Sequence, residues 1–377
     1  MLNSSIGIPF HIVTVLWGEE FCRHYCRFTL PNLLWEGNLP AFHNLPRVRF
    51  RLFVDPESAK LVRREANWEK LAHWVEPEII PIRPPEIPEH NYRDLALLHR
   101  EAIRQANLEG AGMFFLAPDL VLGKGSFAFA LEKIRQGARL VTDAVFRLDR
   151  DTFVEAYGDS TRSRTNRELV RLAAGHLHPV THSLRMDNPR MSFWPSHLIW
   201  PAGKSAFLVR SFHISLFYVN PVDKSVLPDS TVDDDYLEKA IPKGTPEILV
   251  EDSDEMVRFE LSPASKNVGN DGQDRPAGWK WISSWALQHC NSRHCRNIIK
   301  VSRIHSGENI PQLHKLEDGT RQFATLIYYK YVGFKLFTEF SIWKACKTSK
   351  HIGTFIRALQ PHRYSWIKKL KKKIKKK

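Results

Sequence analysis

The strongest constraint on the fold is an alternation of apolar and amphipathic stretches along the first 145 residues. Residue types common in β-strands gather at positions 12–16, 47–54, 79–82, 113–116 and 138–145. Between them, residues 19–28 and 95–110 read as helices, the second with apolar side chains at helical spacing. Strands that alternate with helices predict an α/β fold, in which helices cover both faces of a mixed, largely parallel sheet.

The sequence predicts the start of a helix directly after the second strand. Asp55, Pro56 and Glu57 follow one another there. Asp is a favoured N-cap, Pro suits the first helical position, and an acidic residue suits the first turn. A helix is therefore predicted to begin at Pro56, with Asp55 as its cap.

The later part of the chain lacks this alternation. Residues 176–235 are rich in His, Pro and Trp, with strand-like pieces near 198–200, 207–209 and 214–219, and residues 262–278 are polar and loop-like. We expect a first domain over residues 1–255, a less regular and mainly helical appendage over 256–360, and a polybasic tail over 361–377.

Charge is unevenly spread along the chain. The net charge is +14, and residues 368–377 hold eight lysines, so the remainder carries only +6. This distribution argues against a nucleic-acid-binding protein as a whole. An aromatic and lysine-rich stretch over residues 323–343 precedes the tail, and together they suit the surface of an anionic membrane. A solvated tail over an ordinary aromatic core is the alternative.

Cysteine content and the first residues bear on the compartment. The five cysteines are an odd number in a long chain, which is not the pattern of a secreted disulfide framework. Residues 1–10 lack the basic segment of a signal peptide, and no apolar run is long enough to cross a membrane. We expect a cytoplasmic protein, in part peripheral on the inner face of a membrane.

Ligands of open parallel sheets bind beyond the carboxyl ends of the strands. The residues that follow the predicted strands are Trp17-Gly18, Asp55, Asp119 and Asp143. Asp119 ends an apolar strand and precedes a glycine-rich turn, so its carboxylate could hold a divalent metal with a diphosphate. It could equally serve only to cap a turn.

The order of these elements resembles the nucleotide-sugar-binding half of GT-A-type glycosyltransferases, over roughly residues 8–240. In that family a strand ends in an Asp-x-Asp element that holds a metal and the donor diphosphate. Here the element reads Ala117-Pro118-Asp119, so only Asp119 carries over. The resemblance implies a nucleotide-sugar donor, with Mg²⁺ or Mn²⁺ at Asp119 or basic side chains in its place. It also implies that the nucleoside lies against Thr14, Trp17, Gly18 and Asp55.

Three consecutive carboxylates, Asp233, Asp234 and Asp235, form a second candidate group. Acidic residues are common in the first turn of a helix, and a solvated helix start is one interpretation. Crowded carboxylates also raise one pKa, as a general base requires. By the resemblance, one of them would deprotonate the acceptor hydroxyl in an inverting enzyme.

The remaining candidates are basic residues, histidines and cysteines. Arg185, Lys204 and Arg210 are candidates to neutralise the leaving diphosphate. His176, His178 and His182 lack the spacing of a zinc motif, and most are expected to be structural. The same holds for residues 289–295, where Cys290 and Cys295 have no second well-spaced pair.

Three functions remain open from the sequence. The favoured one is a glycosyltransferase that moves a sugar to a hydroxyl acceptor, in surface-polysaccharide or lipid-linked glycan synthesis. The second is a binding or scaffold protein at a membrane surface, which the missing Asp at position 117 favours. The third, nucleic-acid binding through the tail, is the weakest.

Overall fold

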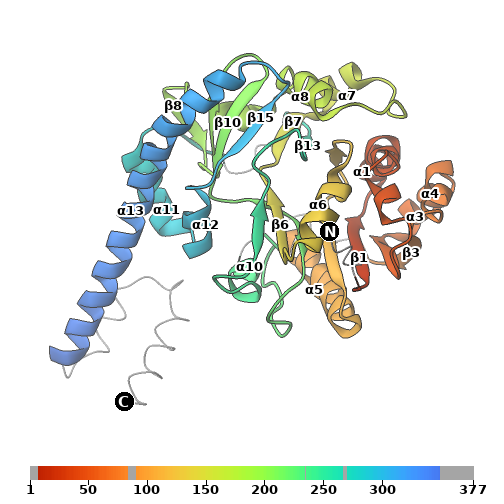
Figure 1. Ribbon diagram of the computed structural model, residues 1–377, viewed down its shortest axis with the longest axis horizontal. Helices are drawn as coiled ribbons and strands as arrows, with labels where there is room; N and C mark the ends of the chain where they lie inside the picture. The colour runs from red at the N-terminus through yellow and green to blue at the C-terminus, as the bar shows by residue number, and fades with distance from the viewer. Residues whose placement is uncertain (1–6, 84–90, 234, 266–269, 349–377) are drawn as a thin grey trace. The chain divides into compact units, whose positions relative to one another are not determined.

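The computed structural model describes residues 7–83, 91–233, 235–265 and 270–348 (Figure 1). Their contacts divide the chain into two units, Met1–Tyr328 and Tyr329–Lys377. The first unit contains all the described strands. The expected boundary at residue 360 lies outside the described residues.

A seven-stranded sheet forms the centre of the first unit. In spatial order its strands are β12 (Glu247–Leu249), β6 (Leu140–Asp143), β11 (Ser215–Val219), β4 (Gly112–Leu116), β1 (Phe10–Leu16), β2 (Val48–Val54) and β3 (Glu76–Pro81). All run in one direction except β11, which is antiparallel to both β4 and β6. The predicted mixed, largely parallel sheet is confirmed.

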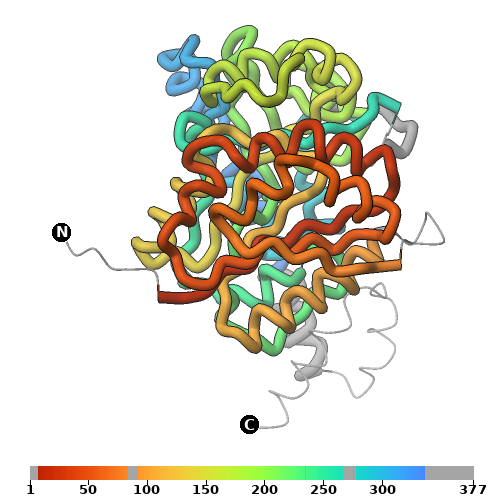
Figure 2. The backbone as a smooth tube through the Cα atoms, turned by 90° about the vertical axis from the view of Figure 1, so that its right-hand side faces the viewer, coloured from red at the N-terminus to blue at the C-terminus, as the bar shows by residue number. Residues whose placement is uncertain are grey.

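Both faces of the central strands β1 and β4 are buried, which explains why these two strands are largely apolar. Along β1, Phe10 and Ile12 join a core with α6 (Ser126–Arg135), while Val13 and Val15 join a core with α5 (Asn91–Glu109). Because successive strand residues point to opposite faces, the helices of the two cores lie on opposite sides of the sheet (Figure 2). α10 (Asp235–Ala240) packs on the same side as α5.

The helical stretch predicted over residues 19–28 is broken by a π-helical turn. Its pieces are α1 (Glu19–His24), the π-helix η1 (Tyr25–Thr29), α2 (Leu30–Leu33) and the 3₁₀-helix η2 (Leu39–Phe42). The Leu30 N–H bonds to the Tyr25 carbonyl five residues earlier, which is the π-helical pattern. The next residue, Pro31, has no N–H to donate to the carbonyl four residues before it. The two helices after β2 are α3 (Pro56–Arg63) and α4 (Ala66–Leu71).

Three smaller sheets extend beyond the carboxyl ends of β4 and β6. They are β15 (Ser302–His305)–β10 (Ala206–Ser211)–β9 (His197–Pro201), β5 (Leu120–Leu122)–β13 (Arg258–Ser262)–β7 (Phe146–Asp149), and β14 (Asn270–Pro276)–β8 (Arg190–Phe193). The accompanying helices are α7 (Arg150–Tyr157), α8 (Asn166–Ala174), α9 (Pro179–Ser183), α11 (Trp279–His289), α12 (Ser292–Asn297) and α13 (Ile310–Thr348). A separate apolar core joins β7, β10 and β13 with α7 and α8.

The described region after residue 255 contains the helices α11, α12 and α13, and it also contains strands that we did not expect. β13 pairs with β5 and β7, and β15 pairs with β10, so these later strands complete sheets begun by earlier residues. β14 also lies within the stretch expected to be a loop. The sequence did not predict these strands, because each is stabilised by pairing with distant residues rather than by its own strand propensity.

Candidate functional site

The sheet has a topological switch point between β1 and β4. β1 pairs with β2 on one side and β4 on the other, and the chain leaves these two strands towards opposite edges of the sheet. Crevices form beyond the carboxyl ends of strands at such points, and ligands of open α/β sheets bind there. We therefore followed the residues at this edge, called the switch edge below: Trp17 and Gly18 after β1, Asp55 after β2 and Asp119 after β4.

Asp55 joins the loops that follow β1 and β2. Its Oδ1 accepts the backbone N–H groups of Glu57 and Ser58 at 3.0 Å each, and its Oδ2 accepts the Gly18 N–H at 3.1 Å. Burial alone would raise the pKa of this carboxyl, but these hydrogen bonds outweigh it and lower the pKa below the ordinary value. The predicted helix cap at Asp55 is confirmed.

Gly18 has a backbone φ of 86°, a conformation that favours glycine. This turn brings its N–H to Asp55 and leaves Gly18 exposed at the switch edge, next to the half-buried Trp17. Thr14 lies deeper. It is fully buried within β1, paired with Leu52 and Leu116, so the sheet surrounds it.

Asp119 follows β4 and is half-buried. Its backbone is fixed from two sides: its carbonyl accepts the Leu261 N–H at 2.8 Å, and the Thr29 hydroxyl contacts the carbonyls of Pro118 and Leu120 at 2.8 Å each. Ala117 is exposed, and its side chain offers no ligand atom. Because Mg²⁺ at a diphosphate needs only one or two protein carboxylates, Asp119 meets the minimum for such a site.

The acidic segment meets the same edge through β11. Because β11 is antiparallel to its neighbours, its first residues lie where β4 and β6 end. Asp233 accepts the Leu216 N–H of β11 at 2.6 Å, which holds this carboxylate beside the sheet. Asp235 begins α10 and is exposed. Asp234 lies outside the described residues.

Residues at the start of α12 also lie against the acidic segment. The His294 ring lies near the backbone of Asp233, and the Asn291 side chain lies 3.5 Å from Asp235 Oδ1. The Nδ1 atom of His294 accepts the Asn291 N–H at 3.3 Å in a capping box. His294 therefore positions the segment, a role with no signal in the sequence.

A buried ion pair lies at the carboxyl end of β6. Asp143 ends β6 and Arg258 begins β13, and both side chains are almost fully buried. The guanidinium forms a two-pronged pair with the carboxylate, with Arg258 Nε 2.9 Å from Asp143 Oδ2, and lies 4.7 Å from the centre of the Phe217 ring. The sequence indicated Asp143 but gave no sign of Arg258.

The three predicted diphosphate-neutralising cations lie elsewhere. Arg210 is 1% exposed, and its guanidinium donates to the Thr320 hydroxyl and to backbone carbonyls, while burial lowers its pKa to about 10. Arg185 pairs with Asp187 through two bonds of 3.0 and 2.6 Å. Lys204 is exposed in the turn between β9 and β10, the whole length of β10 away from the end nearest the switch edge. The structure brings none of the three to the switch edge.

Two clusters in the described part of the chain place potential metal-ligating atoms within 4.8 Å of one another. The first cluster consists of His213, Cys290 and His294, and the Nδ1 atom of His294 accepts the Asn291 N–H. The second consists of Asp252, Asp254 and His305. Its imidazole accepts the Gly307 N–H and contacts Asp252, while Asp254 pairs with Arg167. A metal in the second cluster would have to displace these bonds.

Among the histidines considered in the sequence, His178 has the structural role that was expected. It is fully buried, caps α9 through the Val180 N–H and contacts the Pro263 carbonyl at 2.9 Å. Two other cysteines, Cys22 and Cys26, are buried one turn apart in the helical stretch after β1, and Cys22 contacts the Ser58 carbonyl.

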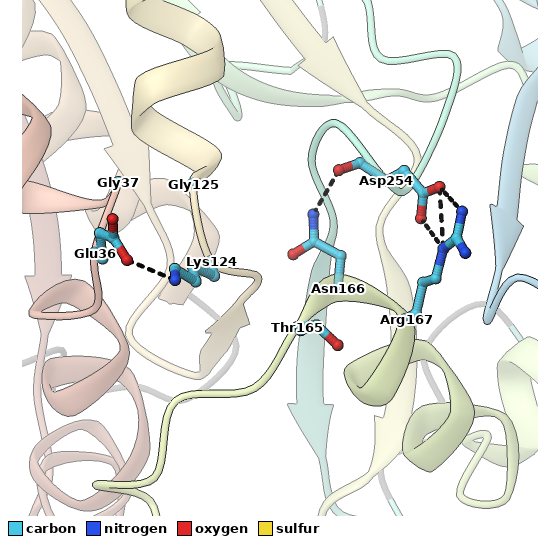
Figure 3. A pocket seen from close by; sticks show the side chains of 8 residues that line it. All are labelled: Glu36, Gly37, Lys124, Gly125, Thr165, Asn166, Arg167 and Asp254. Carbon is cyan, nitrogen blue, oxygen red and sulfur yellow. Dashed lines mark hydrogen bonds and ion pairs between the residues drawn. The ribbon is translucent and has the colours of Figure 1, made fainter.

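A cavity of about 450 Å³ lies apart from these residues (Figure 3). Its lining residues are Glu36, Gly37, Lys124, Gly125, Thr165, Asn166, Arg167 and Asp254. Two ion pairs of 2.6 Å, Lys124 with Glu36 and Arg167 with Asp254, cancel its charge. None of the predicted site residues lines it.

Comparisons with known proteins complete the description. No protein-family model and no curated protein sequence matches the chain. Similar solved structures include the mannosyltransferase PcManGT from Pyrobaculum calidifontis in complex with GDP-Man and Mn²⁺. The match covers 94% of this chain and 81% of that one, with 10% sequence identity and a TM-score of 0.32. A similarity of this size assigns neither family nor activity, and the proposals below rest on the site itself.

Proposed function

We propose that this chain is a GT-A-type glycosyltransferase that moves a sugar from a nucleotide-diphosphate donor to a hydroxyl acceptor. The observation that carries the proposal is the switch point between β1 and β4, where Gly18, Asp55 and Asp119 follow adjacent parallel strands. This is where an open α/β sheet binds nucleotides. The resemblance of the first 240 residues to the GT-A nucleotide-sugar-binding half agrees with it.

The donor would lie with its nucleoside against the loop after β1. Trp17 and Gly18 are the accessible residues there, and Asp55 fixes their backbone. A carboxylate that already accepts three backbone N–H groups is a positioning residue rather than a free ligand. Thr14 is fully buried in β1, between β2 and β4.

Asp119 would face the diphosphate and hold a divalent metal, if the reaction uses one. The metal would neutralise charge on the diphosphate as it leaves. The hydrogen bonds that fix the backbone around Asp119 favour such a role, because a fixed backbone loses little conformational freedom on binding.

The acceptor hydroxyl needs a base, and the described candidates are Asp233 and Asp235. The carboxylate would take the hydroxyl proton as the oxygen bonds to the anomeric carbon and the bond to the diphosphate breaks. Asp233 is held beside β11 with one oxygen on the Leu216 N–H, and Asp235 is exposed at the start of α10.

Ligand-induced thermal stabilisation tests the donor class. Purified protein would be heated with a panel of nucleotides and nucleotide-sugars, with and without Mg²⁺ or Mn²⁺. A true donor at about 100 times its dissociation constant stabilises the fold by about 2.7 kcal/mol. Asp119→Asn should abolish the metal-dependent part of this shift and of sugar transfer. Asp318→Asn, at a side chain that is 83% exposed on α13, is the matched control and should change neither.

The second candidate function is a binding protein built on the same fold. Ala117, in the place of a metal-ligating Asp, is the observation that favours it. It predicts a thermal shift with one nucleotide-sugar but no hydrolysis or transfer with any acceptor. The absence of a shift with every nucleotide tested would exclude both functions.

A further inference from the structure

Three aromatic rings form a column that begins at the protein surface beside α11. Trp194 follows β8 directly and is 51% exposed. Its ring stacks on the ring of His289, the last residue of α11, with the ring centres 5.9 Å apart and the planes 18° from parallel. His289 stacks in turn on Trp285, at 5.6 Å and 29°. Trp285 is buried, so this column, called the Trp194 platform below, holds a flat exposed ring on a base that is anchored in the core.

The backbone after Trp194 is tied to the switch edge. The Ser196 carbonyl accepts the Phe212 N–H at 2.9 Å, and the His197 ring contacts the Val145 carbonyl at 3.1 Å. Val145 lies just after the carboxyl end of β6, and Phe212 lies just before the first residue of β11. Those two strand ends meet at the switch edge, so the Trp194 platform belongs to the same edge as the proposed site.

The platform also lies next to the acidic segment. The chain continues from His289 to Asn291, whose side-chain nitrogen lies 3.5 Å from Asp235 Oδ1. Because two residues span at most about 7 Å, the stacked ring and the acidic segment are neighbours. Asp235 is exposed, and Asp233 is held by the Leu216 N–H at 2.6 Å. The exposed tryptophan and the candidate bases therefore lie at the same part of the switch edge.

A flat aromatic ring beside carboxylates suits a ligand with one apolar face and several hydroxyl groups. A sugar ring in the pyranose form has both. The C–H groups on one face of the sugar pack against the negative face of an aromatic ring, and its hydroxyls donate to carboxylates. A nucleobase also stacks on aromatic rings, but it arrives with phosphates, which the carboxylates of Asp233 and Asp235 repel. The chemistry of this surface therefore favours a saccharide.

We propose that the Trp194 platform binds a sugar ring of the acceptor, so that the acceptor is a saccharide rather than a simple alcohol or a protein side chain. This inference rests on the proposed function, because it names the acceptor of that reaction. An indole ring offers no acid, base or nucleophile here, so Trp194 supplies contact area alone. Its loss should therefore raise the KM for the acceptor with little change in kcat.

Saccharide binding by the full chain tests the proposal without any donor. Among the described residues no helix is long and apolar enough to span a bilayer. The probes are methyl glycosides of glucose, galactose and mannose, with maltose, lactose and cellobiose, in buffer without detergent. Saturation-transfer NMR reports which saccharide binds, and we expect transfer to the C–H protons of one ring face. Trp194→Ala should weaken this binding about tenfold, whereas Trp194→Phe keeps a flat ring and should retain most of it. Tyr92→Ala, at a 55% exposed aromatic of α5, is the matched control and should leave binding unchanged.

Donor binding separates this inference from the proposed function. The thermal shift with a nucleotide-sugar should be the same for Trp194→Ala and the parent, because the donor would lie against the loop after β1. A donor shift, together with saccharide binding that Trp194→Ala leaves unchanged, would overturn the platform and keep the transferase. Saccharide binding that Trp194→Ala abolishes, without any donor shift, would keep the platform as a sugar site and overturn the transferase. Loss of the donor shift in Trp194→Ala would mean that the platform holds a nucleobase. That result, or failure of every saccharide to bind, would overturn the inference.

Discussion

At the scale of single residues, the pair of Asp143 and Arg258 shows how one contact joins distant parts of the chain. The two residues are 115 positions apart, and their side chains are 5% and 1% exposed. Removing both charges from water is costly, and the two-pronged geometry with the Phe217 ring offsets that cost. The loss of either partner leaves the other charge buried alone.

Arg258→Met is therefore expected to destabilise the fold by about 3–5 kcal/mol, measured by urea unfolding. The reason is the uncompensated Asp143 carboxylate rather than the lost attraction. A double variant, Asp143→Leu with Arg258→Met, should recover most of this loss because it removes both charges. A double variant no more stable than the single one would show that packing, not charge, explains the effect.

At the scale of elements, α3 depends on the residue before it. Asp55 satisfies two N–H groups at the start of α3 and also the Gly18 N–H, so the same carboxylate starts a helix and fixes the loop after β1. Its lowered pKa means that this contribution is present above the unfolded pKa of about 3.9. It is lost as pH falls through the lower folded value.

Asp55→Ala should reduce the free energy of unfolding by about 1–2 kcal/mol at pH 7, as the loss of a helix cap does. Asp55→Asn, which keeps an oxygen acceptor, should retain most of the stability. Chemical denaturation at pH 7 and below pH 3 checks the charge contribution. The difference between Asp55→Ala and the parent should shrink at the lower pH, and a constant difference would contradict this account.

At the scale of the whole molecule, buried neutral histidines make stability depend on pH. Burial lowers the pKa of His294 to about 4, that of His213 to about 3 and that of His99 to about 4. In the unfolded chain each has an ordinary pKa near 6.5. Between these values the unfolded state binds more protons than the folded one, so stability falls as pH falls below about 6.5.

For His294, which is 1% exposed, the slope should be about 1.4 kcal/mol per pH unit between pH 6 and 4.5. His294→Gln removes the titrating ring but keeps a side chain that can cap α12. Unfolding free energies across this range should therefore show a shallower slope for the variant. An unchanged slope would mean that His294 is protonated in the folded protein.

Local sequence was sufficient for the elements that depend on neighbouring residues. The apolar runs of β1, β2 and β4 and the Asp-Pro-Glu start of α3 were predicted because burial on both faces and helix capping act over a few residues. The residues of the switch edge followed from the same reasoning, since the end of each strand is visible in the chain.

What only the tertiary structure decided are the contacts between distant segments. Arg210 reads as a candidate phosphate ligand, yet it bonds to Thr320 and to the carbonyls of Ile299 and Glu317. β13 follows a polar segment and β14 lies within one. Both strands are stabilised by pairing with strands that are distant in the sequence. The sequence alone determined the apolar strands β1 and β4 and the start of α3, because these depend on local propensity, burial pattern and helix capping. Which charged side chains are paired inside the fold depends on contacts between residues 89 or more positions apart, and no local pattern encodes them.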